Sequence, residues 1–105
     1  IEAVVTQFQM REAGVDYARQ RIAPVAVETL CRFHRSLSYP ETVHAGLRVG
    51  RLGTSSVTFL IGLFGASDRN APAATGHFIH VYSDRDAETA VPMPDAARAV
   101  YERFR

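Results

Sequence analysis

The sequence predicts an α+β domain in which a long antiparallel sheet wraps around one central helix, with a short helix at the end of the chain. Apolar residues recur at helical spacing at the start, alternate along four later segments, and return to helical spacing near the end. A sheet with an apolar face needs a covering layer, and the first helix is the candidate. A chain of 105 residues has the size of one domain, so residues 1–105 are predicted to form a single unit.

The first helix is predicted from Ile1, Val4, Val5 and Phe8, which fall at i, i+3, i+4 and i+7 and share one face. Gly14 stands where such a helix would end. The helical pattern is present from residue 1, without an initiator Met or an N-capping side chain before it. We therefore expect that sequence upstream of Ile1 is missing from the chain.

The first two strands follow Pro24, where the apolar period changes to two. In the first strand, five alternate residues are predicted to share one face: Val25, Val27, Thr29, Cys31 and Phe33. A turn is predicted from Ser38 to Glu41 because Pro40 cannot donate to a ladder. The second strand starts at Thr42 and has an apolar side made of Val43, Ala45, Leu47 and Val49.

The third strand is apolar on both faces, with Val57, Phe59, Ile61 and Leu63 on one side and Leu60 and Phe64 on the other. It is therefore predicted to be central in the sheet. A loop over residues 66–73 precedes a fourth strand from about Thr75 to Ser83. The short connections predict a four-stranded meander. The terminal helix is predicted to follow an Asp95 N-cap, because Ala96, Ala97, Val100 and Phe104 return to helical spacing.

Composition and charge exclude several functions. The net charge is +1 without a block of like charges, so no nucleic-acid partner is predicted. Cys31 is the only cysteine, which excludes an intrachain disulfide and favours a cytoplasmic location. His77 and His80 are three apart on a strand and face opposite sides, so no metal site is predicted. No apolar run reaches about 20 residues, so no membrane partner is predicted.

Several short motifs occur in a characteristic order. They are R-x-L-x-Y-P at the predicted turn, R-L-G-x-S-S before the third strand, H-V-x-x-D after the fourth, and P-x-P before the terminal helix. Their order and spacing resemble the 4-hydroxybenzoyl-CoA thioesterase branch of the hot-dog superfamily over nearly the whole chain. The resemblance implies the hot-dog fold and hydrolysis of a fatty or aromatic acyl-CoA by a homodimer or a tetramer of dimers, with sites at the subunit interface.

The resemblance also implies a catalytic aspartate in a stretch like D-x-D-x-x-G-H-V-N-N, followed by helix-start N–H groups that polarise the thioester carbonyl. No such stretch occurs in the sequence. We therefore expect the aspartate, and the first strand of the fold, to lie upstream of Ile1. CoA enters as part of the substrate, and no separate cofactor is implied.

Glu2 is the acidic residue near the start of the first helix, and it is the reserve candidate for the carboxylate that assists attack. It can also be interpreted as a first-turn acid that complements the helix dipole. Ser55 and Ser56 do not form a nucleophile elbow, because a strand follows them where the elbow requires a helix.

Six residues are candidates for binding CoA. The family places the turn before the third strand along the pantetheine and nucleotide, so Thr54, Ser55 and Ser56 are candidate hydrogen-bond donors; turn capping is the alternative. Three arginines at or near strand ends are candidate phosphate ligands, and solvated surface positions are their alternative: Arg35, Arg48 and Arg51.

Two other functions remain open. One is a hot-dog domain that binds acyl-CoA without hydrolysing it, as a sensor or scaffold. The other is a hot-dog dehydratase, which needs a histidine and an acid around the helix. The predicted first helix contains no histidine.

Overall fold

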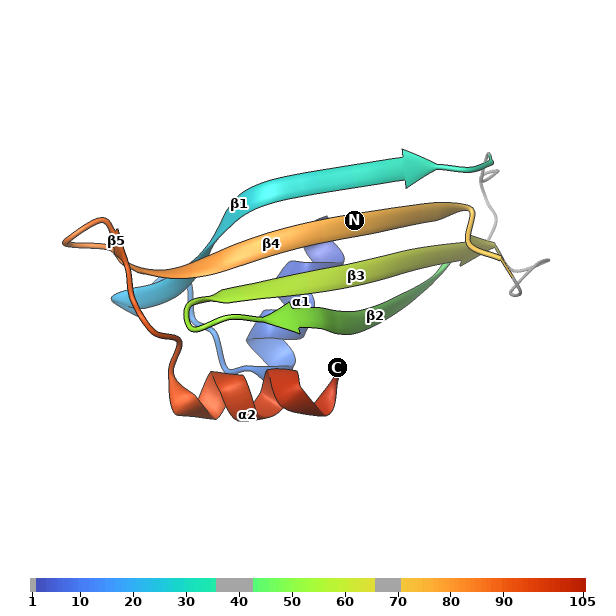
Figure 1. Cartoon of the computed structure of the whole chain (residues 1–105). Coiled ribbons are helices and arrows are strands. Elements are labelled where there is room, and N and C mark those ends of the chain that lie inside the picture. Colours follow the sequence, from blue (N-terminus) through green and yellow to red (C-terminus); the bar gives the residue numbers. More distant parts are fainter. Residues whose placement is uncertain (1, 36–42, 66–70) are drawn as a thin grey trace.

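The computed structural model describes residues 2–35, 43–65 and 71–105. Seven elements follow one another along the chain (Figure 1): α1 (Glu2–Glu12), β1 (Ile22–Phe33), β2 (Val43–Leu52), β3 (Ser56–Gly65), β4 (Ala74–Asp84), β5 (Thr89–Ala90) and α2 (Asp95–Arg103). The predicted Tyr39-Pro40 turn and most of the predicted 66–73 loop lie outside the described residues.

The strands form one antiparallel sheet in the order β1-β4-β3-β2, and the short β5 pairs with β4. The prediction that β3 is central is confirmed. The meander prediction is wrong for β1, which pairs with β4 instead of β2. Alternation along a strand determines which residues share a face, but it does not identify the neighbouring strand. β1 and β2 are therefore the two outer strands of the main path.

A bulge in β1 overturns the prediction that its alternate residues share one face. The pairing with β4 shifts between Ala26 and Glu28, which leaves Val27 as an extra residue. Val25 pairs with Val81, on the face away from the core, whereas Thr29 pairs with the buried Phe78. One inserted residue exchanges the faces of all residues beyond it.

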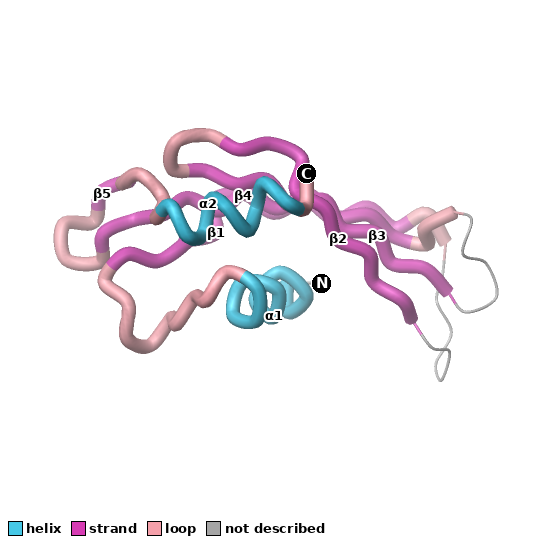
Figure 2. Tube along the Cα trace, turned by 90° about the horizontal axis from the view of Figure 1, so that it is seen from below, coloured by secondary structure: helices cyan, strands magenta, loops and turns pink. Residues whose placement is uncertain are grey.

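α1 lies against one face of the sheet and crosses the strands, and Figure 2 shows it nearly end-on beneath them. The predicted sheet wrapped around one helix is thus confirmed. The core between these layers contains Val5 from α1, Phe59 and Phe78 from the sheet, and Tyr101 from α2, all at most 1% exposed. α2 runs beside β2, where the N–H of Val49 donates to the carbonyl of Phe104 at 2.8 Å.

The ends of the helices differ in how well they were predicted. Gly14 follows α1 with φ of 66°, a left-handed conformation that favours glycine. The prediction of Asp95 as an N-cap is wrong, because Pro94 is the N-cap residue and Asp95 is the first residue of α2. Asp95 therefore lies in the first turn, where its charge complements the helix dipole. Ala96 is exposed, and Ala97 and Tyr101 form the buried face.

Candidate functional site

The first turn of α1 is the chemically distinctive end of this helix. The N–H groups of a first turn have no acceptor within their own helix, and the helix dipole makes this end positive. α1 begins at Glu2, and Figure 1 shows its first turn behind β4 and its last turn beyond β2. The first-turn N–H donors of α1 therefore lie toward the β1 edge of the sheet and away from the β2 edge.

A buried polar network connects α1 to the rest of the domain. The side chain of Gln9 is fully buried, and its amide nitrogen lies 3.1 Å from Nδ1 of His80 and 3.5 Å from the hydroxyl of Tyr101. Its amide oxygen accepts a hydrogen bond from the hydroxyl of Tyr17. The hydroxyls of Tyr82 and Tyr101 are 2.7 Å apart. The network thus joins α1, β4, α2 and the loop that follows α1.

Burial raises the pKa of both Tyr82 and Tyr101 above the ordinary tyrosine value. For Tyr82 the neighbouring Tyr101 hydroxyl raises the pKa further. For Tyr101 the hydrogen bonds with Tyr82 and Gln9 act in the opposite direction but do not outweigh desolvation. Both phenols are therefore neutral hydrogen-bonding groups at physiological pH.

The turn that contains Thr54, Ser55 and Ser56 lies at one end of the sheet, beside the start of α2. The carbonyl of Thr54 accepts from the N–H of Met93 at 3.0 Å and from the guanidinium of Arg98 at 3.3 Å. The carbonyl of Ser55 accepts from the N–H of Tyr82 at 2.8 Å. These bonds, two from backbone N–H groups and one from the Arg98 side chain, hold the turn in place, and Thr54 is exposed.

The three predicted arginines do not all meet in one protomer, although Arg48 and Arg51 lie on the same sheet face because they pair with Leu60 and Thr58. Arg51 precedes the Thr54 turn by three residues and pairs with Thr58 after a register shift at Gly50. Arg35 follows β1 at the opposite end of the strands, where its guanidinium donates to the carbonyl of Ala71. Seven residues of β4 separate these two ends, which corresponds to roughly 20 Å of extended strand.

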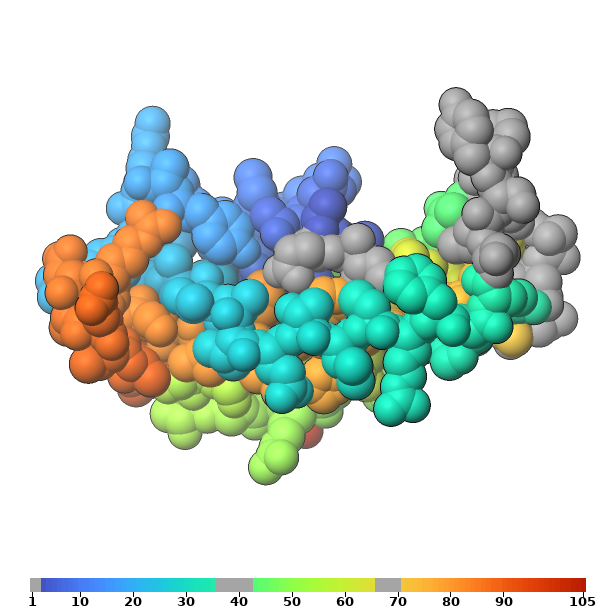
Figure 3. Space-filling view, turned by 90° about the horizontal axis from the view of Figure 1, so that it is seen from above, coloured from blue at the N-terminus to red at the C-terminus, as the bar shows by residue number. Residues whose placement is uncertain are grey.

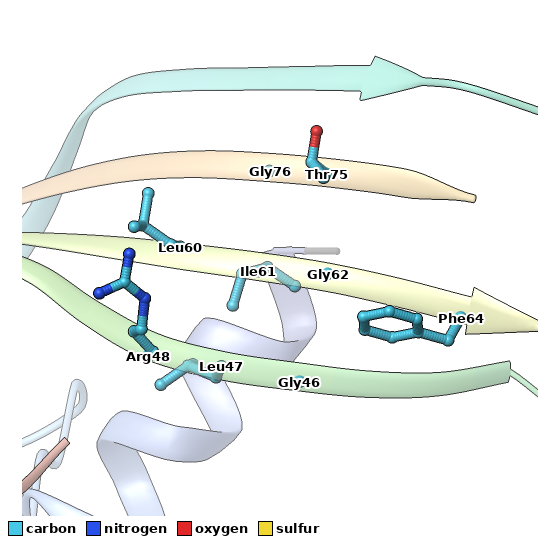
Figure 4. Close-up of a pocket in the computed structure, with 9 residues that line it drawn as sticks. All are labelled: Gly46, Leu47, Arg48, Leu60, Ile61, Gly62, Phe64, Thr75 and Gly76. Atoms are coloured by element: carbon cyan, nitrogen blue, oxygen red, sulfur yellow. The ribbon is translucent and has the colours of Figure 1, made fainter. Parts of the chain in front are cut away.

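Arg48 lies on the sheet face opposite α1, because it pairs with Leu60 while the adjacent Val49 and Phe59 are both fully buried in the core. It borders a hollow of about 540 Å³ (Figure 4). Gly46 and Gly62 pair with each other in this hollow, and the absence of two side chains creates the depression.

The histidines on β4 face opposite sides of the sheet, as predicted. His80 is 3% exposed and faces the core, whereas Nε2 of the half-buried His77 lies 3.1 Å from a carboxylate oxygen of Glu28. In residues 2–35, 43–65 and 71–105, no three His, Cys, Asp or Glu side chains are grouped to hold a metal ion. No helix in this described part of the chain is long and apolar enough to cross a bilayer.

β1 forms a long uncovered edge of the sheet, seen along its length in Figure 3. Phe33 is the most exposed of its large apolar side chains, at 77%. Five such side chains are exposed along β1: Ile22, Val25, Val27, Leu30 and Phe33. Its only charged side chains are Glu28 and Arg32. An edge strand that is long and apolar presents a template for pairing with another strand.

Comparison with known families matches residues 1–101 to the model of the thioesterase-like superfamily. The chain belongs to the thioesterase-like superfamily. A comparison with curated proteins found no match.

Solved structures place this thioesterase-like domain among close structural relatives. The PA5185 protein of Pseudomonas aeruginosa PAO1 is 27% identical with a TM-score of 0.91, and the match covers 99% of this chain and 72% of that protein. The PA2801 protein of P. aeruginosa, a candidate thioesterase, is 31% identical with a TM-score of 0.80, over 93% of this chain and 74% of that one. A Staphylococcus aureus protein, SAV2348, solved with CoA, is 11% identical with a TM-score of 0.88, over 98% and 65%, and shows the fold alone.

The buried network of this thioesterase-like domain was not predicted from the sequence. Gln9 lies four residues after Val5, so it continues the apolar face of α1 with a polar side chain. A polar residue at such a position indicates a buried hydrogen-bonding partner, and this signal was available. Its partners His80 and Tyr101 are 71 and 92 residues away, and nothing local identifies them.

Proposed function

We propose that this domain hydrolyses the thioester of a fatty or aromatic acyl-CoA, as the 4-hydroxybenzoyl-CoA thioesterase branch does. The observation that carries the proposal is the position of α1 in a thioesterase-like fold. Its first turn offers N–H donors on the side of the uncovered β1 edge. Such donors stabilise the oxyanion that forms when a nucleophile attacks a thioester carbonyl. A structural neighbour is named a gentisyl-CoA thioesterase, and another was solved with CoA, which supports this substrate class.

The attack also needs a carboxylate that acts as nucleophile or activates water. Within this chain Glu2, the first residue of α1, is the acid to test. Glu2→Gln removes the charge and retains the shape. A loss of more than about 100-fold in kcat would assign Glu2 to the chemistry, whereas unchanged turnover would assign the carboxylate to another acidic residue.

We further propose that two copies pair through their β1 edges. Antiparallel pairing would bring Arg35 of one copy to the strand end of the other copy, where Arg51 and the Thr54 turn lie. Phosphates of one CoA would then meet arginines of both chains. This arrangement gives a role to Arg35, which is too far from Arg51 within one protomer.

The test of activity uses purified full-length protein and a panel of aliphatic and aromatic acyl-CoA thioesters. Release of the CoA thiol is followed with a chromogenic disulfide, after the single exposed Cys31 has been titrated. Turnover of at least one thioester is expected. Binding of acyl-CoA without release of CoA would refute hydrolysis and identify a non-hydrolytic acyl-CoA-binding domain.

The test of pairing is light scattering on the Leu30→Lys variant. Leu30 is half exposed on β1, so a charge there blocks edge pairing without disturbing the core. Ala99→Lys, on the exposed face of α2, is the matched control. We expect a dimer for the wild type and the control and a monomer for Leu30→Lys. A monomeric wild type would contradict the pairing.

A further inference from the structure

Gln9 is the one polar side chain of α1 that the described structure buries completely. Around it lie apolar groups such as Val5 and Phe59, which pack without directional preference. Its amide, by contrast, makes directional bonds to three separate elements, through Tyr17, His80 and Tyr101. A buried polar group with specific partners fixes one arrangement among those that apolar packing would allow.

The position of Gln9 allows it to control the first turn of α1. It lies seven residues after Glu2, in a helix that rises 1.5 Å per residue, so about 10 Å of rigid helix joins the two. A tilt of about 10° at Gln9 would therefore move the first-turn donors by about 2 Å. Displacements of about 1 Å at a reacting centre can cost about 100-fold in rate.

The bond to His80 has a defined polarity. An amide nitrogen has hydrogens to donate and accepts none, so Nδ1 of His80 accepts from Gln9. The proton of the neutral imidazole therefore lies on Nε2. The amide oxygen of Gln9 is at the same time engaged by the hydroxyl of Tyr17, which fixes the orientation of the amide.

We infer that Gln9 is a positioning residue of the thioesterase site: its amide, clamped between His80, Tyr101 and Tyr17, sets the orientation of α1 and thus of its first-turn oxyanion donors. The inference rests on the proposed thioester hydrolysis. Gln9 touches no substrate in this role and acts through the helix.

The test compares Gln9→Met with Gln7→Met in the full-length protein. Methionine has nearly the length of glutamine and no hydrogen-bonding amide, and Gln7 is exposed on the same helix. We expect Gln9→Met to lower kcat about tenfold or more while KM changes less than about twofold, and Gln7→Met to leave both unchanged. Nitrogen NMR shifts of the imidazoles should show His80 protonated on Nε2 in the wild type, and this preference should weaken in Gln9→Met.

A second variant covers the case in which Gln9→Met does not fold. Tyr101→Phe removes one partner of the same amide with little change in volume, and it should lower kcat about threefold with KM unchanged. The positioning role is overturned if the wild type is active and the folded Gln9→Met variant has the same kcat. If Gln9→Met does not fold, an unchanged kcat in Tyr101→Phe has the same meaning. In both cases the proposed function stays intact. A wild type that hydrolyses no thioester would overturn the proposed function, and with it the role of Gln9.

Discussion

Removing the hydroxyl of Tyr101 should destabilise the domain more than removing that of Tyr82. The two hydroxyls are 2.7 Å apart, and both side chains are at most 1% exposed. Tyr101 is also within 3.5 Å of the amide of Gln9, so Tyr101→Phe leaves two buried polar groups without that partner. A buried group left unsatisfied costs about 1–3 kcal/mol. We expect Tyr101→Phe to lower the free energy of unfolding by about 2–3 kcal/mol and Tyr82→Phe by about 1–2 kcal/mol.

The double variant gives the sharper test. Replacing both hydroxyls with hydrogen leaves two apolar rings facing each other, which removes the cost of an unpaired partner. The double variant should therefore be more stable than the sum of the single effects predicts, by about 1 kcal/mol. The measurement is urea denaturation followed by far-UV circular dichroism, because the chain has no Trp. Protein concentration must be constant, since association would shift the apparent stability. Additive single effects would refute a shared hydrogen bond.

Three further predictions concern pH and backbone conformation. Burial raises the pKa of Tyr82 and Tyr101, so their contribution to stability is complete below pH about 10 and is lost as pH rises further. The free energy of unfolding should therefore fall less steeply with alkaline pH in the variant that carries both Tyr82→Phe and Tyr101→Phe. The hydrogen bond from Arg21 lowers the pKa of Asp84, so its contribution is present above pH about 4 and is lost as pH falls below that value. Melting temperatures of the wild type and Asp84→Asn should differ at pH 7 and converge in acid, and a constant difference would contradict this. Gly14→Ala should cost about 1 kcal/mol because φ is positive, and Gly14→Asn should cost less; equal urea midpoints for the two variants would argue against this.

The candidate site was only partly predictable. The turn before β3 was predicted at residues 51–54 from Gly53 and its polar neighbours, and the structure places it between the end of β2 at Leu52 and the start of β3 at Ser56. Their role in binding CoA stays a prediction. Whether Arg35 and Arg51 lie close together could not be predicted from their separation in the sequence, because the distance between strand ends depends on which strands pair.

The sequence by itself determined the type and approximate extent of the elements. The change of apolar period near residue 24 indicates a strand, which the structure begins at Ile22, and the apolar residues on both faces of β3 indicate its central position. These features are local, because side-chain periodicity follows directly from backbone geometry. The end of α1 before Gly14 is also a local feature, because the positive φ of this residue favours glycine.

The tertiary structure decided everything that depends on partners distant in the chain. The pairing of β1 with β4, the bulge at Val27 and the burial of Gln9 against His80 each involve residues more than 40 positions apart. Such contacts are selected by the simultaneous packing of all layers around one core, so no single segment encodes them. For this protein, the sequence specified the elements, and the packing of α1 across the curved sheet specified the site.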